Sequence, residues 1–292
     1  MSLSINEKIS NGLKALERLK PALHLERGAR PPSYPSHPGH TIAQADPAGG
    51  NGQRTRLNLD ELLAQTGPFP PGTIILGACE DGLPFTLDLN NPAPGALLYS
   101  SDQAEENSAW LHAALLSAMR LNTSRNVHLW VVAARSEAYL DVIQYPHLRH
   151  LAASEDLVTS ALIQEVVELV EQRRHGDPHG PACILAIDDL ASLLHNLDEE
   201  LYRSLNILLR HGPRSRVWPI VTLNASQANQ VDERLLPAFR TRLIGRMPDY
   251  DIGAYLAQDD RLDASQIDEQ GQFFAPFGDE WIRVWACQPA TA

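Results

Sequence analysis

The sequence has 292 residues, of which 43% are apolar and 21% charged, a balance that suits one large α/β domain with an additional arm or two modest domains. Its formal net charge of −12 opposes general binding of polyanions, so any nucleic-acid contact requires a local basic patch. No stretch approaches the ~18 apolar residues of a membrane span, and the amphipathic amino terminus lacks the apolar core of a signal peptide, so we expect a cytoplasmic protein without a membrane span.

The amino-terminal part reads as an arm followed by a linker. Residues 1–25 place apolar side chains at helical spacing, which predicts an amphipathic helix that ends near Pro21. Residues 26–56 are rich in proline, glycine and polar side chains and predict a linker. The helix is either a solvated arm or a docking element for a partner or a neighbouring subunit, and the sequence favours neither.

Residues 57–292 alternate between strand and helix patterns and predict a single domain. Because the helical patterns are 10–20 residues long, the strands are expected to form a mostly parallel sheet flanked by helices, closed by a carboxy-terminal hairpin. Strands are predicted near residues 73–79, 85–89, 96–101, 127–134, 182–190, 217–225, 240–247, 272–277 and 280–287, and helices near residues 57–65, 105–119, 157–175, 199–212 and 251–258.

Two carboxylates follow the buried strand pattern at residues 182–187. Asp188 and Asp189 are expected at the carboxyl end of that strand, where ligands bind in open α/β sheets. A strand ending in two acids is typical of sites that hold Mg²⁺ and place a base beside it. The alternative is structural, since Asp189 is also placed to cap the following helix.

A phosphate-binding loop is expected upstream, between the strand at residues 96–101 and the next helix. Such a loop needs glycines, whose amides wrap phosphates, followed by lysine and Ser/Thr. The segment Ser101–Ser108 reads SDQAEENS and has neither glycine nor lysine, and all lysines of the chain lie in its first 20 residues. Its carboxylates at a helix start repel a triphosphate. The position is therefore right for a phosphate site, whereas the chemistry is wrong.

Several motifs in order make residues 72–288 resemble the motor domain of the FtsK/SpoIIIE/HerA family, which has a RecA-like P-loop NTPase fold. The matching segments are the strand pair GTIILGACEDGLPFTLDL, the segment YPHL, the helix VVELVEQRR, the Walker B-like strand ACILAIDDLASLL and the segment FRTRLIGRM. The resemblance covers about three quarters of the chain and implies an ATP- and Mg²⁺-dependent motor that works as an oligomer.

Carried over by this resemblance, the nucleotide site has lost its main groups. Asn107 stands at the lysine position, Ser108 keeps the magnesium-ligating position, and Asn224 stands at the sensor glutamine. Asp188 and Asp189 take the Walker B positions, so Ser108 and Asp188 would hold Mg²⁺ only if a nucleotide binds. Binding of ATP and Mg²⁺ is accordingly expected to be weak or absent.

The segment from residue 203 to residue 246 contains eight arginines and only two acidic residues, which makes it basic within an acidic chain. They predict either a contact to DNA or a neighbouring subunit, or a solvated face with internal ion pairs. The candidates for a contact are Arg210, Arg214, Arg216, Arg240, Arg242 and Arg246.

Three functions are considered, and the missing phosphate-binding groups favour the first of them. The first is a degenerate motor subunit with a structural or regulatory role in a homo- or hetero-oligomeric assembly that moves DNA or protein. The second is an active ATPase that translocates double-stranded DNA with an unusual loop. The third is an interaction module whose former pocket has no function.

Overall fold

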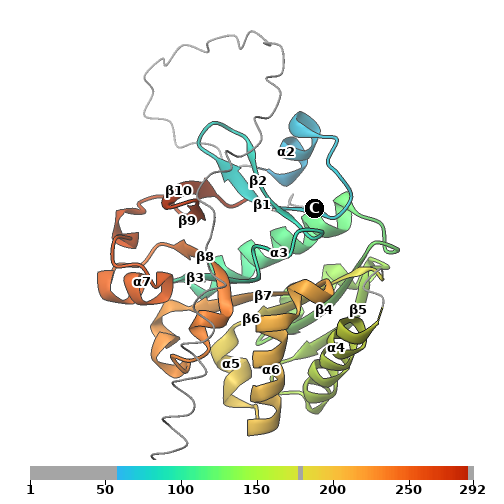
Figure 1. Cartoon of the computed structure of the whole chain (residues 1–292). Coiled ribbons are helices and arrows are strands. Elements are labelled where there is room, and N and C mark those ends of the chain that lie inside the picture. The colour runs from blue at the N-terminus through green and yellow to red at the C-terminus, as the bar shows by residue number, and fades with distance from the viewer. Residues whose placement is uncertain (1–57, 177–179, 289–292) are drawn as a thin grey trace, which may run out of the picture. The chain divides into compact units, whose positions relative to one another are not determined.

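The computed structural model describes residues 58–176 and 180–288, which form one ten-stranded sheet with helices on both faces (Figure 1). The strands follow the order β2-β1-β10-β9-β8-β3-β7-β6-β4-β5. The predicted amino-terminal arm (1–25) and linker (26–56) lie outside the described residues.

Six neighbouring strands are parallel, which confirms the predicted mostly parallel sheet. The edge strand β5 was not predicted, because its segment LRHLAA is only partly buried and lacks a continuous apolar run. The parallel strands are β3 (Ala96–Ser101), β4 (Val127–Ala133), β5 (Leu148–Ala153), β6 (Ala182–Asp188), β7 (Val217–Asn224) and β8 (Phe239–Gly245).

The remaining four strands are antiparallel and extend the same sheet beyond β8. The predicted carboxy-terminal hairpin is formed by β9 and β10, and β10 pairs with β1 of the predicted strand–turn–strand unit. These strands are β1 (Thr73–Cys79), β2 (Pro84–Asp88), β9 (Gln272–Phe277) and β10 (Glu280–Trp285).

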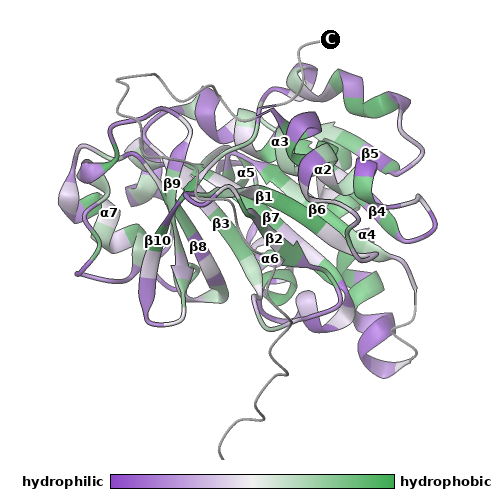
Figure 2. Ribbon diagram, turned by 90° about the horizontal axis from the view of Figure 1, so that it is seen from above, coloured by the Kyte–Doolittle hydropathy of each residue, from purple (hydrophilic) through white to green (hydrophobic). Residues whose placement is uncertain are grey.

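The helices divide into two groups that bury two apolar cores. α2, α3 and the 3-10 segment η2 pack on one face of the sheet, and α4, α5, α6 and α7 pack on the other. Figure 2 shows the central strands as mainly hydrophobic and the outer helices as mixed. None of the described helices is long and apolar enough to cross a bilayer. The helices are α2 (Leu59–Thr66), α3 (Ala104–Leu121), α4 (Leu157–His175), α5 (Leu190–His195), α6 (Glu199–His211) and α7 (Tyr250–Ala257), joined by η2 (Ser136–Gln144), η3 (Pro213–Ser215), η4 (Ala225–Gln230), η5 (Leu236–Ala238) and η6 (Ala264–Gln266).

Buried polar side chains fix α3 against β1. Ser117 Oγ donates to Ile75 O and accepts from Ile75 N, both at 3.0 Å. At the end of the helix, Asn122 accepts from Gly72 N and donates to Thr73 O. Each such hydrogen bond contributes about 1 kcal/mol net and would leave a buried backbone group unsatisfied if it were lost. These hydrogen bonds hold the carboxy-terminal part of α3 against β1 and Gly72.

Candidate nucleotide site

The connection between β3 and α3 is short. β3 ends at Ser101 and α3 begins at Ala104, with Gln103 as its N-cap. The Asn107 amide already donates to Gln103 O at 3.1 Å as part of the helix. A phosphate-binding loop needs several free amides that curve around one anion. Here only Asp102 and Gln103 lie between strand and helix, so the segment aligned with that loop is mostly the first turns of α3.

The Asn107 side chain turns into the protein. It is 2% exposed, its Oδ1 accepts from Ser101 Oγ at 2.7 Å, and its Nδ2 donates to Leu223 O of β7 at 3.1 Å. Asn107 thus ties the start of α3 to the ends of β3 and β7. A lysine at this position in an active site would instead reach outward to the phosphates.

Acidic side chains occupy the first turn of α3. Glu105 is exposed and lies 3.8 Å from the guanidinium of Arg135. Glu106 is buried and accepts a hydrogen bond from the amide of Gly271 in the loop before β9. Both carboxylates lie where the helix dipole favours an anion, so the protein itself supplies the negative charge that a phosphate would bring.

Asp188 lies at the end of β6 and is 4% exposed. Its carboxylate accepts from Ser108 Oγ and from Thr222 Oγ1, each at 2.7 Å. Burial, and next the charge of Asp188, raise the pKa of Tyr139 well above its ordinary value, so that phenol stays neutral beside the carboxylate. The structure therefore brings together the serine and the aspartate that were predicted as magnesium ligands, through a direct hydrogen bond.

Asp189 serves as a helix cap. Its backbone is left-handed, with φ of 70°, and its carboxylate accepts from the amide and hydroxyl of Ser192 at the start of α5. Its amide donates to Thr222 Oγ1 at 2.9 Å. Asn224 has a similar role, because its Oδ1 accepts from Ser226 N at 2.9 Å and caps η4. The hydrogen bonds of Asp189 to Ser192 therefore match the structural role, a helix cap, that the sequence offered as the alternative for Asp189.

A cavity of about 150 Å³ lies at these groups, and all five predicted residues line it: Asn107, Ser108, Asp188, Asp189 and Asn224. Ligand pockets usually measure ~300–1,000 Å³, so this one is small for a nucleotide. Sequence reasoning missed Thr222 and Arg135, which also line it. The one available indication was their place: each lies at or just beyond the carboxyl end of a parallel strand.

The six arginines predicted for DNA or subunit contact do not gather on one surface. Arg240 and Arg246 lie at opposite ends of β8, roughly 20 Å apart at the rise of a strand. Arg242 is partly buried and donates to Leu236 O and Ala257 O, and burial lowers its pKa. Among residues 58–176 and 180–288, none of the six forms an ion pair. The others are Arg210 at the end of α6, the exposed Arg214 in η3 and Arg216 before β7.

The fold defines the class of protein: an α/β domain with the sheet of a RecA-like P-loop NTPase. No family model and no curated protein matches the sequence. Among solved structures, the cytoplasmic domain of the type VII secretion ATPase EccC from Thermomonospora curvata is similar, with a TM-score of 0.62 and 17% identity over 82% of this chain and 33% of that one.

Two further structures show the same likeness. The ATPases 2 and 3 of EssC from Geobacillus thermodenitrificans give a TM-score of 0.62 at 15% identity over 78% of this chain and 49% of that one. The pCW3 conjugation coupling protein TcpA, solved with ATPγS, gives 0.60 at 14% over 76% of this chain and 67% of TcpA. The chain spans about a third of the length of the solved EccC cytoplasmic domain. These structures confirm the predicted fold, that of an FtsK-like motor domain, at identities that carry the fold alone.

Proposed function

We propose that this chain is a degenerate FtsK/HerA-like domain with a structural or regulatory role in an assembly that translocates DNA or protein, and that it does not hydrolyse ATP. The observation that supports this most strongly is Asn107. Its side chain is buried and bonded to Ser101 and Leu223, so the position that supplies the phosphate-binding charge in a P-loop holds two strands together instead.

The other groups at the site support the same proposal. A triphosphate carries several negative charges, and the first turn of α3 offers it Glu105 and Glu106 without any lysine. Residues 21–292 contain no lysine at all. Ser108 and Asp188 fit a magnesium ion, but in P-loop sites that ion is shared with nucleotide phosphates, which this site does not fit. Asp189 caps a helix, so its carboxylate is already engaged.

The charge of the domain argues against the alternative, an active translocase of double-stranded DNA. Residues 58–292 carry 16 arginines and no lysine against 32 aspartates and glutamates. Arg240 and Arg246 lie at opposite ends of β8, and Arg242 donates to Leu236 O and Ala257 O, so the six candidate arginines do not add up to one phosphate-binding stripe. DNA contact would need to be local and supported by other subunits.

The test is a calorimetric titration of ATP and ADP with Mg²⁺ into the full chain, together with a phosphate-release assay with and without duplex DNA. We expect neither heat nor turnover. A nucleotide that binds only the folded state also raises the melting temperature, so an unchanged melting curve at millimolar ATP is a second expected result. Turnover that disappears in Asp188→Asn would overturn the proposal and favour the active motor.

A further inference from the structure

The amino ends of four neighbouring parallel strands form one continuous edge of the sheet, at the opposite end of these strands from the nucleotide site. Ala182 N of β6 donates to Asn126 O before β4 at 2.8 Å, and Cys183 N donates to Arg216 O before β7 at the same distance. β5 pairs with β4 from its first residue. We call this surface the amino edge; it consists of residues 123–128, 145–149, 173–176, 180–182 and 210–217.

All charged side chains of the amino edge are basic. The described residues of these segments include seven arginines and four histidines, and no aspartate or glutamate. Arg174 and Arg210 lie in the last turns of α4 and α6, where they complement the helix dipoles. Each dipole end is equivalent to only about half a negative charge, so most of the positive charge remains uncompensated. The arginines are Arg125, Arg149, Arg173, Arg174, Arg210, Arg214 and Arg216.

Three of these arginines lie close together without a counter-ion. Burial raises the pKa of the Cys183 thiol, and the charges of Arg173, Arg149 and Arg216 all oppose that rise. Arg149 also donates to Nε2 of His128, and burial, and next the charge of Arg149, lower the pKa of that imidazole. Within residues 58–176 and 180–288, none of the three arginines forms an ion pair. Like charges held together repel one another, and a bound anion removes that repulsion.

Arg216 carries a further sign of a constrained site. Its backbone is left-handed, with φ of 56°, which is uncommon for a long side chain, and its buried Nε has no partner among the described residues. Arg173 holds this segment in place, because its guanidinium donates to Ser215 O at 3.1 Å and to Pro181 O at 2.8 Å. The edge between β6 and β7 is therefore a fixed surface that presents positive charge.

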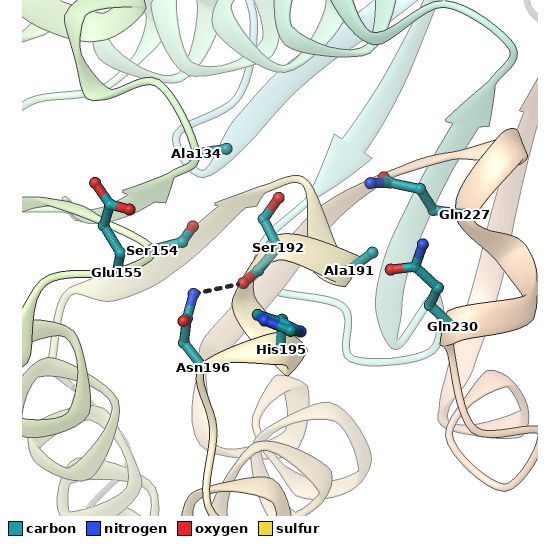
Figure 3. Close-up of a pocket in the computed structure, with 9 residues that line it drawn as sticks. All are labelled: Ala134, Ser154, Glu155, Ala191, Ser192, His195, Asn196, Gln227 and Gln230. Atoms are coloured by element: carbon teal, nitrogen blue, oxygen red, sulfur yellow. Dashed lines mark hydrogen bonds between the residues drawn. The ribbon is translucent and has the colours of Figure 1, made fainter.

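The carboxyl edge of the sheet has the reverse charge. Acidic residues follow four of its strands, among them Asp102, Glu137, Glu155 and Asp189. A cavity of about 320 Å³ at this edge is lined by the loop after β5, by α5 and by η4; among its described lining residues, Glu155 and His195 are titratable, and there is no lysine or arginine (Figure 3). Of the two edges, only the amino edge suits an anionic partner.

We infer that the amino edge binds an extended acidic segment of a partner protein. Four strands at a spacing of ~4.8 Å span about 14 Å, the length of roughly four extended residues. Guanidinium groups pair with carboxylates through two parallel hydrogen bonds, so a run of aspartates or glutamates matches this row of arginines. The inference does not depend on whether the nucleotide site is active.

An acidic peptide fits the amino edge better than duplex DNA, because acidic residues border it. The bordering ion pairs are Glu171–Arg174, Asp60–Arg120 and Asp232–Arg234. A duplex presents phosphates along both sides of a groove ~12 Å wide, so some of its phosphates would meet these acids. A single extended peptide is narrow enough to contact the arginines alone.

The inference is tested with two peptides of similar size and different charge. Capped hexaglutamate and capped hexaglutamine, each with a fluorophore, are titrated into the full chain and followed by anisotropy. We expect hexaglutamate to bind at about 50 mM salt and to weaken at least about tenfold at about 500 mM, because salt screens exposed charges. Hexaglutamine should not bind. Absence of hexaglutamate binding at about 50 mM salt, or equal binding of the two peptides, would overturn the inference.

Substitutions locate the binding to the amino edge. The double variant Arg125→Gln with Arg214→Gln removes two exposed charges and should weaken hexaglutamate about tenfold, from about threefold for each exposed ion pair. The matched control is Arg246→Gln with Arg283→Gln, which removes the same charge from exposed positions at the end of β8 and in β10. We expect less than about a twofold change in the control. Equal weakening by the two double variants would contradict binding at the amino edge. Melting curves verify that both are folded.

Two other occupants are decided in the same experiment. A short DNA duplex that binds more tightly than hexaglutamate, and weakens in the Arg125/Arg214 variant, would overturn the inference and assign the edge to nucleic acid. A second copy of the chain is disfavoured because acids of its carboxyl edge, such as Asp188 and Asp189, already accept internal hydrogen bonds. Sedimentation of the chain alone should therefore show no association that this variant removes; such association would overturn the assignment to a partner protein.

Discussion

The two parts of the candidate nucleotide site, at the ends of β6 and β3, differ in how many of the groups of a working P-loop site they contain. At the end of β6, Ser108 and Asp188 remain as a hydroxyl–carboxylate pair of the kind that holds magnesium. At the end of β3, the segment that should wrap the phosphates is helical from Ala104, and Asn107 is bonded to Ser101 and Leu223. The difference shows that polar groups can persist where they also serve as internal hydrogen-bond partners, whereas a glycine-rich loop has no such second use.

Among substitutions that test this difference, we expect the largest change in stability from one at the end of β3. Asn107→Lys places an ammonium in a site that is 2% exposed and removes both hydrogen bonds of Asn107. We expect a loss of about 3 kcal/mol in the free energy of unfolding, measured by urea denaturation, without any gain of ATP binding. Glu105→Lys introduces the same residue at an exposed position and should change stability by less than about 1 kcal/mol. Restored ATP affinity in Asn107→Lys would show that the loop is only one residue away from a working site.

At the β6 end, Asp188→Asn leaves one carbonyl oxygen to serve the hydroxyls of Ser108 and Thr222. If these hydrogen bonds now have a structural role, the variant should lose about 2 kcal/mol in chemical denaturation. Sites kept for catalysis often behave in the opposite way, because removal of a buried carboxylate relieves strain. A variant more stable than the parent chain would therefore contradict the comparison and indicate a working metal site.

A smaller effect is expected next to it, at Asp189. Asp189→Ala removes the cap of α5 and leaves alanine, which tolerates the left-handed region less well than aspartate, at a φ of 70°, so the melting temperature should fall by the equivalent of about 1 kcal/mol. Asp189→Asn keeps both the cap and tolerance of this backbone and should stay within a few tenths of a kcal/mol. A large loss in Asp189→Asn would mean that the negative charge itself is needed, as expected of a base or a metal ligand.

Replacement of Tyr99, a buried residue of β3, is expected to stabilise the protein. Its buried hydroxyl has no partner among the described residues, so Tyr99→Phe is expected to raise the free energy of unfolding by about 1 kcal/mol. Burial, and next the charges of Glu106 and Asp102, raise the pKa of Tyr99 well above 10.0. Because the folded-state pKa lies above the unfolded one, the parent's stability is unaffected by this group below pH 10 and falls as pH rises towards the folded-state pKa. Urea titrations from pH 8 to 11 should show a shallower fall in Tyr99→Phe, and an unchanged slope would contradict this assignment.

The sequence by itself determined the architecture, because periodicity is a local property. The apolar run at residues 182–187 and the alternation of strand and helix patterns were sufficient to predict the parallel sheet, and the missing lysine was visible at once. The edge strand β5 was not predicted, because a strand that pairs with a neighbour on only one side does not need a continuous apolar run.

What only the tertiary structure decided is how the polar residues are used. The sequence placed Asp189 and Asn224 at strand ends and offered a helix cap only for Asp189, as one of two alternatives. Whether each side chain accepts amides of the next helix depends on the local φ and on where the chain turns. It could not show that Asn107 turns inward, since Leu223 lies 116 residues away along the chain. Hydrogen bonds between distant segments have no local sequence pattern, and for that reason the site had to be read from the fold.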